Sequence, residues 1–133
     1  MERNQAVRIF KTLIIVQSSY TLLTAIWPLI DIESFMAVTG FKTDQWLVKT
    51  VGALLIPIAV TLISYLFVKT NPAPAFVLGS LTSIALIWVD FYFSGKNVIP
   101  DIYQLDGWME LCFLLTWIYL ASFRFKEIFR GVR

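Results

Sequence analysis

The sequence predicts an all-α protein, a four-helix transmembrane bundle with both termini in the cytoplasm. Three observations predict this fold: long apolar stretches, a composition unlike that of soluble proteins, and a sorting of acidic and basic residues to opposite sides. Of 133 residues, 58% are hydrophobic and only 15% are charged, whereas soluble domains have about 25% charged residues. The mean hydropathy of +0.73 agrees. As soluble helices, these stretches would leave almost no polar surface for water.

Each apolar stretch is close to the length of about 20 residues that crosses a bilayer as a helix. The stretches cover residues 9–30, 46–68, 73–93 and 107–123. They use most of the chain and leave short connections, so we expect residues 1–133 to form a single integral membrane domain. We also expect the first stretch to be retained, because it is longer than the apolar core of a signal peptide.

The first span carries a polar stripe. Gln17, Thr21 and Thr24 are four and three residues apart, so they share one face of a helix. A polar face inside a membrane is expected to point into the bundle rather than towards lipid.

The connection between the first two spans, Asp31–Thr43, is expected to be the longer external loop. Thr43 or Asp44 is well placed to cap the second span. The next connection contains Pro72 and Pro74, which cannot continue a helix and therefore predict a tight turn. The second and third spans should then form an antiparallel hairpin.

The third span contains Gly79 and Ser83, a spacing of small residues that permits close helix contact within the chain or between subunits. Aromatic and basic residues alternate in the tail after residue 123. That pattern predicts an amphipathic continuation of the fourth span at the membrane surface.

Basic residues collect at one side of the predicted bundle, which holds eight of the eleven Lys and Arg residues. Acidic residues dominate the other side. Because basic loops stay in the cytoplasm, this sorting predicts cytoplasmic termini in a bacterial inner membrane or an equivalent one. The eight basic residues are Arg3, Arg8, Lys11, Lys69, Arg124, Lys126, Arg130 and Arg133.

Several classes of chemistry are not expected. The chain has no His and one Cys, whereas zinc, haem and iron–sulfur sites depend on imidazole and thiolate ligands. A Ser–His or Cys–His nucleophile is excluded, and nucleotide-binding fingerprints are absent. We therefore expect no metal, no cofactor and no nucleic-acid partner; the basic ends are anchors for anionic lipid headgroups.

Ionisable residues that fall near the outer ends of the spans are the candidates for chemistry. Counting from the cytoplasmic anchors places Lys49, Asp90, Asp106 and Glu110 at similar depth on three spans. Such groups are costly in a membrane and should face the bundle. The candidate catalytic acids are Asp90, Asp106 and Glu110, and the candidate ligand-binding residues are Trp46, Lys49, Asp90, Tyr103, Asp106 and Glu110.

Two interpretations of this cluster remain open. In the first, the carboxylates and Lys49 form the floor of a pocket that opens to the outer leaflet, where they share a proton or hold a cation. In the second, Lys49 pairs with Asp90 or Glu110 to fix helix register, and the aromatic residues form an ordinary interfacial belt. The proposed walls of the pocket are Trp27, Trp46, Trp88, Tyr92, Tyr103 and Trp108.

Residues 35–62, with Thr39-Gly40 ahead of Trp46-Leu47-Val48-Lys49, and the later run Asp106-Gly107-Trp108-Met109-Glu110 resemble small bacterial four-span proteins that are DoxX-like in layout. A looser resemblance is to the EXPERA group of sterol isomerases and sterol-binding proteins. That resemblance implies a lipid-facing cavity in which acids protonate or bind an amphiphile. Asp90, Asp106 and Glu110 would be those acids.

The sequence leaves three classes of function open. The protein could bind an amphiphile or a membrane partner through the pocket. It could carry out an isomerase-like or proton-coupled reaction with its carboxylates. It could also act as an accessory subunit of a membrane complex, or as a homodimer. The lipid bilayer is the one partner common to all three.

Overall fold

A computed structural model of the protein describes residues 2–132. Within them the chain is helical and contains no strand. The elements are α1 (Glu2–Ile30), α2 (Ile32–Thr39), α3 (Gln45–Ser64), α4 (Ala73–Gly95), α5 (Tyr103–Tyr119), the π-helical turn η1 (Leu120–Arg124) and α6 (Phe125–Val132). Four helical segments are long and apolar enough to cross a membrane, namely α1, α3, α4 and the continuous segment from α5 to α6. The predicted all-α bundle of four spans is confirmed.

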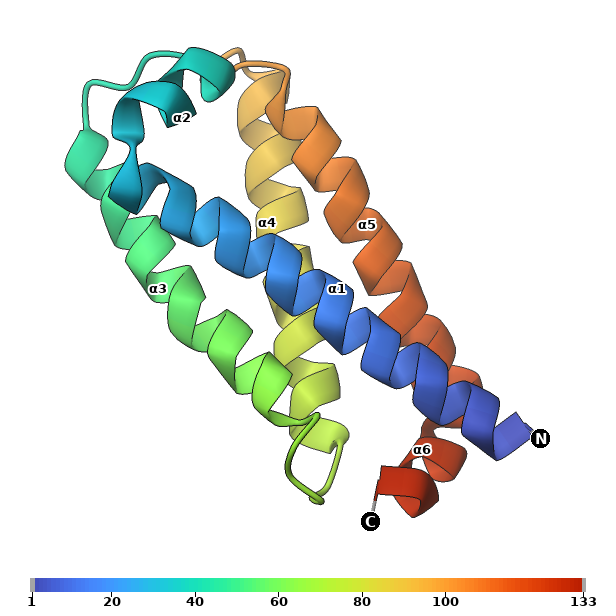
Figure 1. The fold of residues 1–133 in the computed structure, drawn as a ribbon. Coiled ribbons are helices and arrows are strands. Elements are labelled where there is room, and N and C mark those ends of the chain that lie inside the picture. Colours follow the sequence, from blue (N-terminus) through green and yellow to red (C-terminus); the bar gives the residue numbers. More distant parts are fainter. Residues whose placement is uncertain (1, 133) are drawn as a thin grey trace.

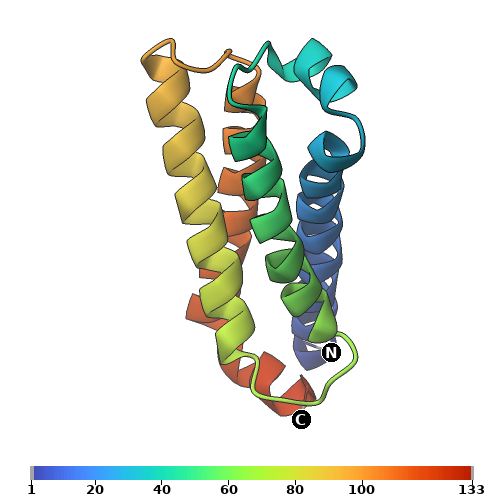
Figure 2. The ribbon, with the colours of Figure 1, turned by 90° about the vertical axis from the view of Figure 1, so that its left-hand side faces the viewer.

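The four long helices form two packed pairs, α1 with α3 and α4 with α5 (Figure 1). Both ends of the chain lie at one end of the bundle, and α2 lies at the other end with the connection between α4 and α5 (Figure 2). We call the end that holds both chain termini the terminal end, and the opposite end the α2 end.

Small residues allow the helices of each pair to approach closely. A Cβ atom on Gly52 of α3 would lie 2.5 Å from the carbonyl oxygen of Ala25 in α1. A Cβ atom on Gly79 of α4 would lie 2.4 Å from the indole of Trp117 in α5. The predicted close contact at Gly79 and Ser83 is therefore formed within the chain, where both residues are buried.

The apolar core fills the half of the bundle towards the terminal end. The ring of Trp117 meets Phe10 edge-on at 6.0 Å and Phe76 at 5.0 Å between centroids. Ile128 of α6 is fully buried in the same cluster. Because packed side chains fill the interior of this half, the space inside the bundle is left in the other half.

The external connection contains a helix that the sequence analysis did not predict. Asp31 caps α2, because its carboxylate accepts a hydrogen bond of 3.0 Å from the backbone N–H of Ser34. This bond lowers the pKa of the Asp31 carboxyl below its ordinary value. Of the two caps expected for the second span, Asp44 occupies the N-cap position of α3, without a side-chain hydrogen bond.

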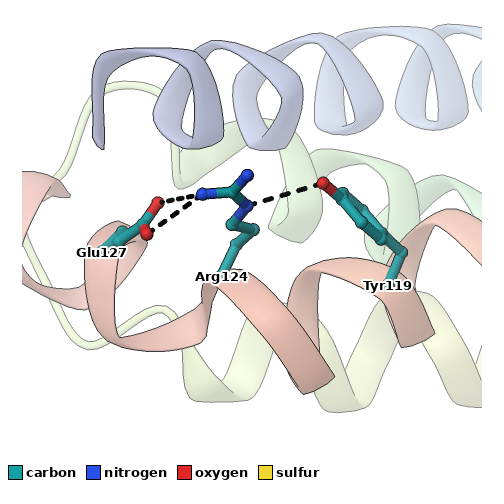
Figure 3. A network of polar contacts seen from close by, with 3 residues as sticks. All are labelled: Tyr119, Arg124 and Glu127. Carbon is teal, nitrogen blue, oxygen red and sulfur yellow. Dashed lines mark hydrogen bonds and ion pairs between the residues drawn. The ribbon is translucent and has the colours of Figure 1, made fainter. Parts of the chain in front are cut away.

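The spans begin or end at residues other than those predicted. The second was expected to reach residue 68, but α3 ends at Ser64; a turn follows in which Tyr65 and Leu66 pack against the core, and residues 67–71 are exposed. The fourth was expected over 107–123. It begins at Tyr103 and continues through η1 into α6. In η1, Arg124 donates hydrogen bonds to Glu127 at 3.1 and 3.3 Å and to the hydroxyl of Tyr119 at 3.5 Å (Figure 3).

The helical continuation of the tail is present, but its apolar side packs partly on the protein. Ile128 and Val132 are buried, and α6 lies against α1. A Cβ atom on Gly131 would lie 2.5 Å from Val7 of α1. The tail therefore packs on α1, the membrane-surface role expected for it stays a prediction, and Arg133 lies outside the described residues.

Candidate functional site

A cavity of about 420 Å³ lies in the half of the bundle towards the α2 end. Side chains from the helices α1 to α5 line it, and most of them are apolar. Its size is in the range of small-molecule sites. The lining residues include Tyr20, Thr24, Trp27, Phe35, Val48, Val51, Leu55, Leu86, Val89, Asp90, Tyr103, Asp106 and Glu110.

The structure brings the three predicted acids together on this lining. Asp90 of α4 is 3% exposed, and Glu110 of α5 is fully buried. Asp106 lies one turn before Glu110 on the same face of α5, and it lines the same cavity as Asp90 and Glu110. Carboxyl groups that gather in a largely apolar cavity can share a proton. Of the four ionisable groups expected at similar depth, the three acids share this lining, and their role in binding or catalysis stays a prediction.

A chain of buried hydrogen bonds leads to Glu110 from three other positions. The indole N–H of Trp117 donates to Oε1 of Gln17 at 2.7 Å, and Nε2 of Gln17 donates to the hydroxyl of Ser83 at 3.0 Å. The hydroxyl of Ser83 then donates to Oε2 of Glu110 at 2.6 Å. Nε2 of Gln17 also donates to the carbonyl oxygen of Gly79 at 3.2 Å.

This chain has a fixed direction. An indole N–H can only donate, so the Gln17 atom that faces it is the carbonyl oxygen and the other is the amide nitrogen. The amide donates to Ser83, whose one hydroxyl hydrogen is then directed to Glu110. Oε2 of Glu110 therefore accepts a hydrogen bond, and any proton that Glu110 carries is on Oε1.

Two oxygen atoms of the cluster have no hydrogen-bond partner within residues 2–132. They are Oε1 of Glu110 and Oδ2 of Asp90, both buried and both in residues that line the cavity. A buried polar atom without a partner costs about 1–3 kcal/mol. A bound group that donates hydrogen bonds to these oxygens would recover that cost.

Tyr20 of α1 is a member of the site that the sequence analysis missed. Its hydroxyl donates a hydrogen bond of 2.5 Å to Oδ1 of Asp106. The signal was available, because Tyr20 lies three residues after Gln17 and four before Thr24, on the polar stripe. The stripe itself faces inwards as predicted, with Gln17 and Thr21 buried and Thr24 half-buried.

Of the aromatic walls that were predicted, Trp27 and Tyr103 line the cavity. Trp46, Trp88 and Trp108 are exposed, at 66%, 58% and 57%. None of these three is a lining residue, and neither is Tyr92. Exposed aromatic side chains near the ends of spans are typical of an interfacial belt, which stays a prediction.

Lys42 connects the α2 end of the bundle to the cavity wall. Its ammonium donates to the carbonyl oxygens of Thr39 and Gly40 at 2.8 and 3.1 Å and lies 5.1 Å from the ring centroid of Tyr103. Burial lowers the pKa of Lys42 below its ordinary value. This contact holds the end of α2 over a residue that lines the cavity.

The structure does not bring Lys49 to the carboxylates. Both predictions for Lys49 therefore need correction, namely its place in the floor of the pocket and its ion pair with Asp90 or Glu110. Lys49 is exposed and makes no ion pair with any described residue. The reason is the packing of α3, which turns Gly52, Ala59 and Leu62 into the bundle. Trp46 and Lys49 therefore lie outside the site that Asp90, Tyr103, Asp106 and Glu110 share.

The lining of the cavity contains acidic residues and, among the described residues, neither Lys nor Arg. Such a site favours a bound cation or hydrogen-bond donor and disfavours an anion. Within residues 2–132, no group of three or more His, Cys, Asp or Glu residues is arranged to hold a metal ion.

Comparison with known protein families, with curated proteins and with solved structures found no match to this chain. The resemblances to DoxX-like proteins and to the EXPERA group stay predictions.

Proposed function

We propose that the protein binds an amphiphile in the cavity between its helices. The head of the amphiphile would meet Asp90, Asp106 and Glu110, and its apolar body would lie among side chains such as Val51, Leu55 and Val89. The observation that carries this proposal is the pair of buried carboxyl oxygens without partners in a largely apolar cavity.

The hydrogen bonds of the site indicate which head would fit. The hydroxyls of Tyr20 and Ser83 are already directed to Asp106 and Glu110. The buried hydroxyl of Thr21 also lines the cavity without a partner, and the acid cluster itself is left with acceptor oxygens to offer a ligand. An amine or a hydroxyl can donate to them, whereas a carboxylate head would be repelled.

Binding of simple amphiphiles to the purified protein in nanodiscs tests the proposal. We expect dodecylamine to bind more tightly than dodecanol, and dodecanoate to bind least, in a competition assay with a fluorescent alkylamine. Equal binding of all three would contradict a site formed by acceptor oxygens. No saturable binding of any of them would contradict the function itself.

A matched pair of substitutions locates the binding. Val51 and Val60 are both on α3 and are both 51% exposed, but only Val51 lines the cavity. Val51→Trp should reduce binding at least tenfold because the indole fills the cavity, whereas Val60→Trp should leave binding unchanged. Equal effects would place the ligand elsewhere on the protein.

A second pair tests the acids. Glu110→Gln should weaken the binding of dodecylamine by more than tenfold and that of dodecanol far less, because it removes a buried negative charge. Asp101→Asn is the control, since Asp101 is an exposed acid at the α2 end and does not line the cavity. An equal loss in both variants would show that only the general surface charge matters.

Acid catalysis on the bound amphiphile is a second candidate, and the direction of the hydrogen-bond chain favours it. A proton on Oε1 of Glu110 lies on the atom that has no partner in the protein. Transfer of that proton to a double bond, with removal of another proton from the adjacent carbon by Asp90 or Asp106, would be an isomerisation without net uptake of protons.

Deuterium incorporation separates binding from catalysis. We expect lipids extracted from the protein after incubation in heavy water to carry carbon-bound deuterium if the isomerisation occurs, and this label to disappear in Glu110→Gln. Saturable binding without label in the natural protein would leave only the binding function.

We further propose that the terminal end faces the cytoplasm of a bacterial cell. The sorting of charges supports it, because Arg3, Arg8, Lys126 and Arg130 lie at that end while Asp31, Glu33 and Asp101 lie at the α2 end. The cavity would then lie in the outer half of the membrane.

A further inference from the structure

A second recess lies between α1 and α5, outside the cavity. It has a volume of about 640 Å³, and its side chains come from these two helices alone. We call it the α1/α5 groove. Its lining residues are Gln5, Arg8, Ile9, Thr12, Leu13, Val16, Met109, Cys112, Phe113 and Thr116.

The groove is separate from the cavity. The ring of Tyr20 packs edge-on against Phe113 at 5.9 Å between centroids, and its hydroxyl is bound to Asp106. Phe113 is part of the groove, whereas Tyr20 and Asp106 line the cavity. These side chains form a wall between the two spaces.

The groove changes in polarity along its length. Leu13 and Phe113 are buried and form its floor, and Val16 and Met109 form exposed apolar rims. Gln5 and Arg8 lie at the terminal end. From residue 5 to residue 16 a helix rises about 16 Å, which is close to half of the bilayer core of about 30 Å. The groove is therefore about as long as the hydrocarbon region of one leaflet.

The guanidinium of Arg8 has no acidic partner among the described residues. Arg3 and Lys11 are exposed nearby on the same helix, and Glu127 is paired with Arg124. The polar end of the groove is therefore positively charged, and an anionic phosphate is its natural complement.

We propose that the α1/α5 groove binds an anionic phospholipid, with one acyl chain on Leu13, Val16 and Phe113 and the phosphate at Arg8. The lipid belongs to the leaflet at the terminal end. This site is independent of the proposed amphiphile cavity and of any reaction there.

The natural Cys112 provides the probe. It is the only cysteine of the chain, it is exposed and it lines the groove. In detergent, the rate of maleimide addition to Cys112 should fall at least fivefold as dioleoyl phosphatidylglycerol is titrated in, and the fall should saturate. Dioleoylglycerol lacks the phosphate and inorganic phosphate lacks the chains, so neither should protect Cys112 at the same concentrations.

Charge variants test the head of the lipid. Arg8→Gln should raise the lipid concentration for half protection about fivefold, the effect of one basic side chain near a phosphate. Arg3→Gln and Lys11→Gln are the matched controls, because both remove a cation from the same helix but not from the groove. They should leave the midpoint unchanged.

Tryptophan variants test the position of the chain. Ile15 and Val16 are neighbours with similar exposure, 48% and 44%, and only Val16 lines the groove. Val16→Trp should abolish protection by the lipid, whereas Ile15→Trp should not. Circular dichroism of every variant confirms that it is folded.

Three results would overturn the proposal. They are protection that rises without saturation, equal protection by dioleoylglycerol, or the same midpoint for Arg8→Gln and Arg3→Gln. Each would mean that lipid contacts this face without a site. Loss of amphiphile binding in the cavity would leave the expected results at Cys112 unchanged.

Discussion

Gln17 connects three helices through one buried amide. It accepts from Trp117 of α5 and donates to Gly79 and Ser83 of α4, while its own backbone belongs to α1. Together with the contacts of Phe10 with Trp117 and of Tyr20 with Asp106, this side chain holds the two helix pairs together near the floor of the cavity. It also sets the direction of the hydrogen bonds that reach Glu110.

Replacement of Gln17 should therefore affect both stability and the site. Gln17→Met leaves the indole N–H of Trp117 without an acceptor, at a cost of about 1–3 kcal/mol. Unfolding of the purified protein in sodium dodecyl sulfate measures this cost. Gln5→Met, on the exposed start of α1, is the control, and equal stability of the two variants would contradict a joining role for Gln17.

The acids could be predicted from sequence, but their partners could not. Asp90, Asp106 and Glu110 stand out because charge inside an apolar span demands burial. Lys49 and Trp46 satisfied the same counting of depth, yet α3 turns both of them outwards. Hydropathy does not say which face of a membrane helix is inside, because lipid is as apolar as the core.

At the scale of the elements, close packing of α4 on α5 depends on the absence of a side chain at position 79. The spacing of Gly79 and Ser83 predicted this contact, but the sequence could not show that Trp117 fills the space beside Gly79. Likewise, α2 was missed because it is only eight residues long. The turn η1 was missed because a π-helical turn is not encoded by local propensity.

Gly79→Ala should destabilise the protein because the new methyl group would collide with the indole of Trp117. Overpacking of this kind costs about 1–3 kcal/mol. Gly95→Ala is the matched control on the same helix, since a Cβ atom there would meet nothing within 4 Å. A difference in detergent unfolding between the two variants measures the contact, and equal stabilities would contradict it.

The cap of α2 should depend on pH. The folded pKa of Asp31 lies below the ordinary value of 3.8 because the carboxylate accepts from Ser34. The stabilisation is therefore complete above this ordinary value and is lost as the pH falls through the lower, folded pKa. The protection factor of the Ser34 amide in hydrogen exchange should fall there, and Asp31→Ala should lower it at neutral pH. An unchanged protection factor in Asp31→Ala would contradict the cap.

At the scale of the whole molecule, the four spans were the most predictable feature. The structure has four helical segments that are long and apolar enough to cross a bilayer, and length and apolar composition can both be read directly from sequence. The sequence did not predict the pairing of α1 with α3 and of α4 with α5, because this pairing depends on local fit, such as the absence of a side chain at Gly52 where the backbone of Ala25 approaches. The cavity is a consequence of that pairing.

The orientation of the molecule is tested by reporter fusions. A reporter joined after Arg133 should be active only if it is a type that works in the cytoplasm. One inserted at Asn97, in the connection between α4 and α5, should be active only if it works outside. Activity of an external reporter after Arg133 would overturn the proposed topology.

The burial of acids on the fourth span also constrains how the protein is made. The segment from Tyr103 to Val132 has the lowest hydropathy of the four candidate spans, 1.2, and it carries Asp106 and Glu110 near its start, where an acid opposes insertion by less than the roughly 3 kcal/mol of a central position. Ser83 and Tyr20, which bind Glu110 and Asp106, lie on helices synthesised earlier. The last helix should therefore enter the membrane efficiently only beside its completed neighbours, so that assembly follows the order of synthesis.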